Sequence, residues 1–189
     1  DVDACEAFFT PGSLLLTQME IPLETVAYGL KLAKERDMTT LLNPAPYVPL
    51  DDRILKSTDI LTPNQSEAAG LTGAAPEARS AVQQGLVRLL SQGMQAILMT
   101  RGADGVLQVT REGIEHVPAY PVKPVDTVAA GDAFNGVLAA GLAAGMPLAK
   151  AVRLASAAGA LCTTRRGAQE SLPGREEIEA LSGLRFVQS

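Results

Sequence analysis

An acidic residue follows three small residues in the stretch Asp126-Thr-Val-Ala-Ala-Gly-Asp-Ala-Phe-Asn-Gly136. The small residues 129–131 precede Asp132, and an apolar run continues to Met146, so this stretch is typical of a loop that turns directly into a helix. Small residues let backbone N–H groups approach a ligand, and the first turn of a helix attracts anions. A carboxylate placed there favours phosphoryl transfer, with Asp132 as the base that accepts a proton from the attacking group.

A structural role for the same acid is equally compatible with the spacing alone, because acids at helix starts complement the helix dipole. Two other phosphate-binding motifs are excluded. Gly131 and Gly136 have the spacing of the paired glycines in a P-loop, but Val137 occupies the position of the required lysine. No Gly-x-Gly-x-x-Gly follows a predicted strand, which leaves a dinucleotide-binding fold unsupported.

The composition fits one globular domain of ordinary size. The chain has 189 residues, of which 47% are apolar and 20% are charged. Its net charge of −5 argues against nucleic acid or an anionic membrane as a partner. No apolar run is long enough to span a bilayer, and no secretory signal is expected at the start. The sequence begins with Asp1 rather than Met, so part of a longer protein is one interpretation.

The few thiols and imidazoles restrict the chemistry further. Cys5 and Cys162 lie far apart in the sequence, which favours a reducing, cytoplasmic setting over a disulfide framework. His116 is the sole histidine, so a His/Cys zinc site is not expected. A Ser-His-Asp triad would have to use His116, which lies in a strand-like alternating run.

Strands and helices alternate along most of the chain. Apolar runs predict four strands, at residues 13–19, 39–42, 59–62 and 96–100. Helical spacing predicts helices at residues 22–37, 66–71 and 77–92, with a short one within 49–55. A hairpin at the sheet's edge follows at residues 106–110 and 114–118, and then helices from the Asp132 loop to about 145, at 148–162 and at 174–181. This order indicates an α/β fold with a mostly parallel sheet.

Polar residues follow several of the predicted strands at their carboxyl ends. In parallel sheets ligands bind at that edge. Glu20 follows the first strand, Asn64 the third and residues 100–105 the fourth, while residues 126–132 follow the hairpin. The convergence indicates one ligand site.

Each of these residues also has a purely structural interpretation. Asn64 and Glu67 have the spacing of a turn and a helix cap, which is favoured over contact with phosphate and Mg²⁺ from spacing alone. Residues 100–105 are typical of a glycine-rich turn, although their N–H groups could also meet phosphates. Glu20 is uninformative in isolation.

The motifs together resemble the PfkB-type carbohydrate kinases, also called the ribokinase family. The stretch 126–136 is similar to the C-terminal signature of that family. Four further segments resemble family segments in the same order: Asn43-Pro-Ala-Pro46, Thr62-Pro-Asn-Gln-Ser-Glu67, Thr100-Arg-Gly-Ala-Asp-Gly105 and Arg166-Gly-Ala-Gln-Glu-Ser171. The resemblance runs from about Leu14 to Leu181 and covers about the last two-thirds of a family member.

The resemblance implies a three-layer α/β sandwich that is incomplete at its N-terminal side. It implies that residues 1–189 are the nucleotide-binding and catalytic portion of a sugar kinase domain. The first strands, the lid sheet and most sugar contacts have no counterpart in this chain. A homodimer of the full-length protein, paired through the lid, is the implied assembly.

The resemblance also implies roles for individual residues. Asp132 matches the catalytic base, which also contacts the sugar. Glu20 matches a second acid that contacts the sugar. The backbone N–H groups of Ala130, Gly131 and Asp132 match the hole that stabilises the transferring phosphoryl group. The implied nucleotide-binding residues are Asn64, Thr100, Arg101, Gly102, Ala103, Asp104, Gly105, Gly131, Asp132 and Ser156. Ser156 stands near the adenine, where ribokinases more often carry His or Asn.

Two metal ions are implied as well. Glu67 matches the acid that organises Mg²⁺ through water. A monovalent cation site, suited to K⁺, is implied for Asp126, Val128, Cys162, Arg165, Gly167 and Ser171. Several of these act through backbone carbonyls, so the resemblance requires the carbonyl of Cys162 and not its thiol.

The reaction implied by the resemblance is ATP-dependent phosphorylation of a sugar's primary hydroxyl, with D-ribose as the first candidate. A related kinase acting on another sugar or on a nucleoside is one alternative. A truncated fragment that binds nucleotide, or a partner protein, without turnover is the other. The expected partners are the sugar and ATP, with Mg²⁺ and K⁺ as cofactors and the cytoplasm as the compartment.

Overall fold

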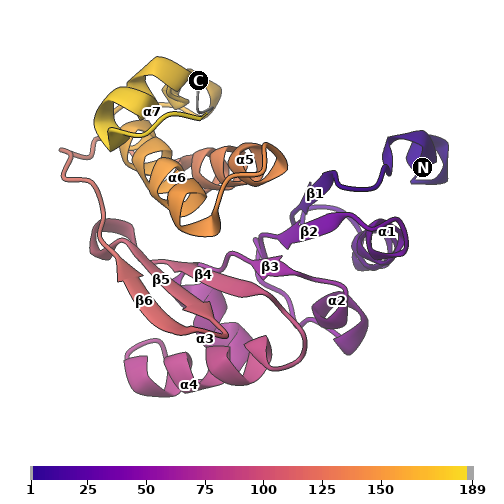
Figure 1. Cartoon of the computed structure of the whole chain (residues 1–189). Coiled ribbons are helices and arrows are strands. Elements are labelled where there is room, and N and C mark those ends of the chain that lie inside the picture. Colours follow the sequence, from indigo (N-terminus) through magenta and orange to yellow (C-terminus); the bar gives the residue numbers. More distant parts are fainter. Residues whose placement is uncertain (1, 187–189) are drawn as a thin grey trace. The chain divides into compact units, whose positions relative to one another are not determined.

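Four of the six strands in the sheet pair in parallel and in chain order, as Figure 1 shows for the computed structural model of residues 2–186. The order is β1-β2-β3-β4-β5-β6. The strands are β1 (Leu14–Thr17), β2 (Thr39–Leu42), β3 (Ile60–Leu61), β4 (Ala96–Thr100), β5 (Val106–Thr110) and β6 (Gly113–Val117). The register places Leu41 opposite Ile60, and Ile60 opposite Ala96.

Helices connect strands β1 to β4, and further helices follow β6. They are α1 (Leu23–Glu35), α2 (Asp52–Lys56), α3 (Gln65–Thr72), α4 (Arg79–Leu90), α5 (Ala130–Ala143), α6 (Leu148–Cys162) and α7 (Arg175–Ser182). Three 3₁₀ turns complete the chain: η1 (Asp3–Phe8), η2 (Gly102–Asp104) and η3 (Gln169–Ser171). The α/β fold and the edge hairpin predicted from the sequence are confirmed, while η1 and η3 were not predicted.

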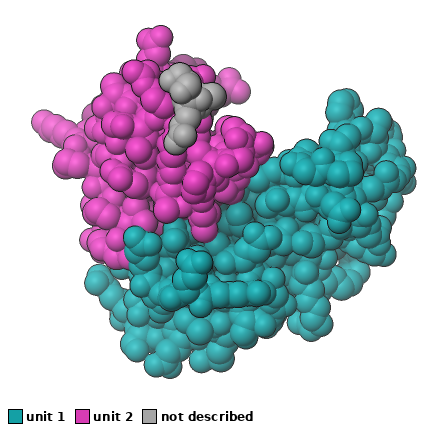
Figure 2. Space-filling view, in the orientation of Figure 1, with its two compact units in different colours: residues 1–101, 107–115 teal, residues 102–106, 116–189 magenta. Residues whose placement is uncertain are grey.

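The chain divides into two compact units, which Figure 2 colours separately. Unit 1 contains residues 1–101 and 107–115, and unit 2 contains residues 102–106 and 116–189. Strands β1 to β4 and helices α1 to α4 belong to unit 1, whereas helices α5 to α7 belong to unit 2.

Unit 1 has a continuous apolar core. Strands β2 and β4 are buried along nearly their whole length, because a parallel sheet needs apolar side chains on both faces. Leu42, Leu61 and Ile97 are fully buried and pack with Leu30 of α1 and Leu86 of α4. This core holds the carboxyl ends of β1 to β4 in a fixed arrangement.

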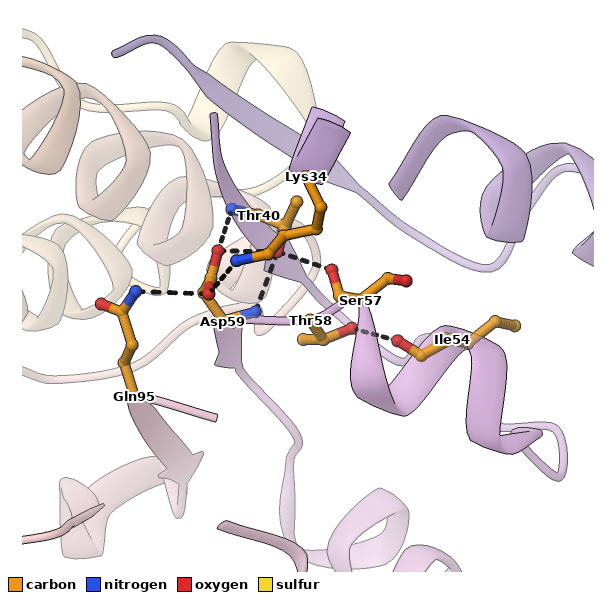
Figure 3. Close-up of polar contacts among 7 residues, drawn as sticks. All are labelled: Lys34, Thr40, Ile54, Ser57, Thr58, Asp59 and Gln95. Carbon is orange, nitrogen blue, oxygen red and sulfur yellow. Dashed lines mark hydrogen bonds and ion pairs between the residues drawn. The ribbon is translucent and has the colours of Figure 1, made fainter. Parts of the chain in front are cut away.

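A buried carboxylate ties the other end of these strands together (Figure 3). Asp59 is 5% exposed and precedes β3. Its Oδ2 accepts hydrogen bonds from the Thr40 backbone N–H (3.0 Å) and hydroxyl (3.1 Å), and its Oδ1 accepts from Lys34 Nζ (2.7 Å) and Gln95 Nε2 (3.2 Å). One side chain thereby links α1, β2, β3 and the residue before β4.

Unit 2 is built on helices α5 and α6, which pack closely together. Gly159 of α6 lies against the start of α5, where a side-chain carbon at that position would come within 3.2 Å of the Ala130 carbonyl oxygen. Gly141 of α5 leaves room in the same way for Ala151 and Met146. The absence of side chains at these two glycines allows close packing, which positions the start of α5.

Within residues 2–186, no helix is both long enough and apolar enough to cross a bilayer.

Candidate active site

The loop that contains Asp132 starts α5 with an unusual backbone conformation. Ala129 precedes the helix with φ of 60° and ψ of 5°, the left-handed region that residues other than glycine adopt infrequently. The Ala130 N–H donates to Thr127 O (3.3 Å), and the Ala133 N–H donates to Ala129 O (2.9 Å). The amides of Gly131 and Asp132 precede that first helical bond, so they face the direction from which the helix attracts anions.

Space is open around this first turn. Asp132 and Gly131 are exposed, and a side-chain carbon added at Gly131 would meet no atom within 4 Å. The buried Asn135 donates from Nδ2 to Gly131 O (2.9 Å), which fixes the peptide beside the acid. Asp132 thus lies in the first turn with the amides of Gly131 and Asp132, while the Ala130 N–H donates to Thr127 O; the anion-binding role of these amides stays a prediction.

Asp126, at the beginning of the loop, has a different environment. Its Oδ1 accepts a hydrogen bond from the Val128 N–H (3.1 Å), and its Oδ2 accepts one from the Gly167 N–H (3.3 Å). These backbone N–H groups, that of Val128 first, lower the pKa of Asp126 below its usual value. The carboxylate stays ionised at neutral pH and joins the loop before α5 to the loop after α6.

A buried cysteine and serine lie beside the Val128 carbonyl. Cys162 Sγ is 3.5 Å from Val128 O and 3.1 Å from Ser171 Oγ, and both side chains are fully buried. Ser171 Oγ also donates to Ala168 O (2.7 Å). The structure therefore brings together Asp126, Val128, Cys162, Gly167 and Ser171, five of the six residues predicted to form a cation site.

The sixth residue, Arg165, follows α6 in the same segment. Its N–H donates to Cys162 O (3.3 Å), while its guanidinium forms an ion pair with Glu177 of α7. Its side chain is thus engaged by α7, and only its backbone belongs to the loop. Among residues 2–186, no three His, Cys, Asp or Glu side chains gather as a metal site. The oxygen atoms available here are those of the Asp126 carboxylate, the Val128 carbonyl and the Ser171 hydroxyl.

Asn64 and Glu67 form a helix cap at the start of α3. Glu67 accepts from the Asn64 N–H (2.7 Å) and from Asn64 Nδ2 (2.8 Å), and the Glu67 N–H donates to Asn64 Oδ1 (2.9 Å). Burial raises the pKa of Glu67. The structural interpretation of this pair is confirmed, and its contact with phosphate and Mg²⁺ stays a prediction.

Other predicted residues of unit 1 lie at the carboxyl ends of the strands. Thr100 pairs with Asn64 through a parallel bridge, and the Thr100 N–H donates to Pro63 O (2.9 Å). Glu20 is exposed in a bend after β1. Arg101 follows β4 and borders a small surface depression beside Arg79 of α4.

Asn43, for which no role was predicted, connects these strand ends. Asn43 follows β2, accepts from Gln18 Nε2 (3.1 Å) and donates to Thr62 O (2.9 Å). It is buried, so these bonds satisfy polar atoms that water cannot reach. In the sequence, the available signal was an asparagine directly after a predicted strand.

The predicted nucleotide loop, residues 102–105, is a tight turn in unit 2. Gly105 has φ of 78°, and a side-chain carbon there would lie 2.1 Å from Val117 O, so only glycine fits. His116 Nε2 is 2.6 Å from Asp104 O, which gives the sole histidine of the sequence a structural role in this turn. Ser156 is buried in α6, and its Oγ has no hydrogen-bond partner among the described residues.

The predicted site residues thus fall into two groups. Unit 1 holds Glu20, Asn64, Glu67, Thr100 and Arg101, and unit 2 holds Gly102, Ala103, Asp104, Gly105, Asp126, Val128, Ala130, Gly131, Asp132, Ser156, Cys162, Arg165, Gly167 and Ser171. Within each group the structure defines the local geometry.

Comparison with known proteins identifies the family. A family model described as pfkB family carbohydrate kinase matches residues 4–175. The chain belongs to this family. Curated pfkB-family relatives include a ribokinase of Haemophilus influenzae, 38% identical over 174 residues, and a deoxyribokinase of Salmonella typhi, 33% identical over 185 residues.

These relatives are longer than this chain. The alignments cover 91% and 97% of the chain but 56% and 60% of the two relatives. Among solved structures, Arabidopsis thaliana ribokinase complexed with ribose and ATP is similar, with a TM-score of 0.89 and 27% sequence identity. That alignment covers 97% of this chain and 60% of the plant protein. The chain therefore spans little more than half of these pfkB-family proteins.

Proposed function

We propose that this chain is the nucleotide-binding and catalytic portion of an ATP-dependent sugar kinase, with D-ribose as the acceptor. The observation that carries the proposal is the exposed Asp132 in the first turn of α5, beside amides that precede the first helical hydrogen bond. The names of the relatives support the choice of ribose. Deoxyribose is the second candidate, since one relative is a deoxyribokinase.

In the proposed reaction, the Asp132 carboxylate accepts the proton of the sugar's primary hydroxyl. The hydroxyl oxygen forms a bond to the γ-phosphorus of ATP, while the bond from that phosphorus to the bridging oxygen breaks and ADP leaves. The amides of Gly131 and Asp132 and the dipole of α5 stabilise negative charge on the transferring phosphoryl group. The Ala130 N–H donates to Thr127 O, so it contributes to this charge stabilisation only if that bond opens.

We propose further residues for contact with the nucleotide and the sugar. For ATP we propose Asn64, Thr100, Arg101, the turn at residues 102–105 and Ser156, whose buried hydroxyl lacks a partner among the described residues. For the sugar we propose Glu20 in addition to Asp132.

The residues at the loop of Asp126 fit a large monovalent cation. The Val128 carbonyl, the Ser171 hydroxyl and one ionised carboxylate supply oxygen atoms with a single negative charge, which suits K⁺ better than a divalent ion. Bound there, K⁺ would add positive charge beside the start of α5. We propose Asp126, Val128, Cys162, Arg165, Gly167 and Ser171 as its ligands.

Glu67 fits Mg²⁺ only through water. Asn64 occupies one position on each carboxylate oxygen, and the remaining lone pairs can accept hydrogen bonds from water bound to a metal. Mg²⁺ bound to ATP would neutralise phosphate charge during transfer.

The experiment is ADP release by the full-length protein with ATP, Mg²⁺, K⁺ and each of a panel of ribose, deoxyribose, fructose and nucleosides. We expect ribose to give the highest kcat/KM. A nucleoside or another sugar as the best acceptor would correct the substrate. Nucleotide binding without ADP release for any acceptor would favour the non-catalytic alternative, which the shorter length of this chain makes worth testing.

A further inference from the structure

Cys162 places a side chain, and not only a backbone carbonyl, among the residues of the proposed cation site. The residue is 0% exposed at the last position of α6. Its sulfur lies 3.5 Å from Val128 O and 3.1 Å from Ser171 Oγ. Both of these oxygens belong to residues proposed as cation ligands, so the thiol lies between two members of the ligand set.

The hydrogen-bond directions at this thiol are limited. Ser171 has one hydroxyl proton and donates it to Ala168 O at 2.7 Å. The thiol proton must then point to Val128 O or to Ser171 Oγ, and both oxygens can accept it. In either arrangement the sulfur lies within contact distance of both oxygens.

The three residues come from separate segments of unit 2. Val128 lies in the loop before α5, Cys162 ends α6, and Ser171 ends η3. Asp126 and Gly167, both half-buried, join the same two loops by a backbone N–H to carboxylate bond at 3.3 Å. The Cys162 thiol is the buried counterpart of that bond.

We propose that Cys162 is a positioning residue of the cation site, and that its thiol holds the Val128 carbonyl and the Ser171 hydroxyl at a spacing that suits K⁺ over Na⁺. The inference rests on the cation site of the proposed function. Selectivity between the two ions depends on the size of the cavity and on how firmly its oxygens are held. A side chain that fixes two oxygens therefore affects selectivity without touching the ion.

The test uses thermal unfolding of the full-length protein in KCl, NaCl and choline chloride, a readout that does not require activity. Cys162→Ala removes the sulfur, Cys162→Val fills similar space without a donor, and Cys162→Ser keeps a donor as the conservative replacement. Cys5→Ala is the matched control, because Cys5 is an exposed free cysteine in unit 1.

We expect the KCl concentration for half-maximal stabilisation to rise about two- to tenfold in the Ala and Val variants, the range for one lost hydrogen bond. Their preference for K⁺ over Na⁺ should fall in parallel, and the Ser variant should lie nearer to the unmodified protein. The Cys5 variant should show no change.

Equal loss of stability in all three salts, with the K⁺ midpoint unchanged, would mean that Cys162 only fills space and would overturn the proposal. If Cys162→Ala does not fold, Cys162→Val decides the question by the same midpoint. Absence of any K⁺-specific stabilisation in the unmodified protein would remove the cation site and this inference together. The separate assay of ADP release would still decide whether the protein is a kinase.

Discussion

Two carboxylates near the start of α5 have different environments, Asp126 in the loop before the helix and Asp132 in its first turn. Asp126 accepts two backbone N–H groups, which lower its pKa and fix its position. Asp132 is exposed in the first turn of α5, where space is open around Gly131. A fixed, ionised acid suits the organisation of a loop or a cation, whereas an exposed acid beside anion-attracting amides suits proton transfer. These environments support the proposed division of roles.

Replacing Asp132 with Asn should lower kcat by about 10²- to 10⁴-fold, because the amide cannot accept the hydroxyl proton. The affinity for ATP should change little. Steady-state kinetics and calorimetric titration of ATP measure the two effects. Glu176→Gln, which alters an exposed acid in the first turn of α7, is the matched control and should retain full activity. A normal rate for the Asp132 variant would exclude it as the base.

At the scale of elements, the buried Asp59 decides how β2, β3 and α1 are joined. Asp59→Ala should destabilise the protein by about 2–4 kcal/mol, because the buried Thr40 N–H loses its acceptor and further hydrogen bonds are lost. Lys34→Ala should cost under about 1 kcal/mol, since the lysine side chain is partly exposed and its ion pair is screened. Urea unfolding of both variants tests the order, and equal losses would contradict it.

Glu179 joins helix α7 to the residues that follow it, Arg185 and Phe186. The Phe186 N–H, together with Arg175 and Arg185, lowers the pKa of Glu179 to about 2 from an ordinary value of 4.5. A lowered pKa in the folded state means that the stabilisation is complete above about pH 4.5 and is lost as the pH falls towards 2. Glu179→Gln should therefore lower Tm at pH 7.

The Tm difference between the Glu179→Gln variant and the unmodified protein should shrink between pH 5 and about pH 3. Thermal unfolding at several pH values checks this. Glu176→Gln, on the same helix, should show little difference at any pH. A Glu179 difference that grows on acidification would contradict the assignment.

At the scale of the whole molecule, β1 forms one edge of the sheet and presents half-buried leucines. Edge strands in folded proteins commonly carry charges or are covered, and Leu14 to Leu16 provide neither. Because the matched relatives are longer than this chain, we propose that the strand corresponding to β1 has a further neighbour in such longer proteins. Amides of residues 14–17 should exchange with deuterium faster than those of β2 in the 189-residue chain, and at similar rates in a longer protein. Fast exchange at β1 in both would contradict this arrangement.

The sequence predicted the elements well where burial or backbone chemistry is local. β2 and β4 have the predicted bounds, and nearly all of their residues are buried. β3 contains only Ile60 and Leu61 of the predicted residues 59–62, and the side chain of the preceding Asp59 binds Thr40 and Lys34. Such a contact joins residues that are distant in sequence, so no local pattern reveals it.

The candidate site shows the same contrast. The loop, its acid and the cap at Asn64 follow from residue types and spacing. The thiol contact of Cys162 with Val128 and Ser171 depends on how α6 packs in unit 2, and the sequence around Cys162 does not reveal it. The division into two units also arises from long-range packing rather than from a linker in the sequence.

The left-handed backbone of Ala129 has a further consequence for the conformational freedom of the loop. Ala129→Gly should leave stability nearly unchanged, because about 1 kcal/mol of relieved strain offsets a similar loss from greater freedom of the unfolded chain. The free energy of unfolding in urea should stay nearly constant, whereas kcat should fall because the loop samples more conformations. A rise in both the free energy of unfolding and kcat would contradict this. Ala129 thus restricts the loop to one conformation when the protein folds. In the proposed reaction, the reacting groups then need no further ordering in each catalytic cycle.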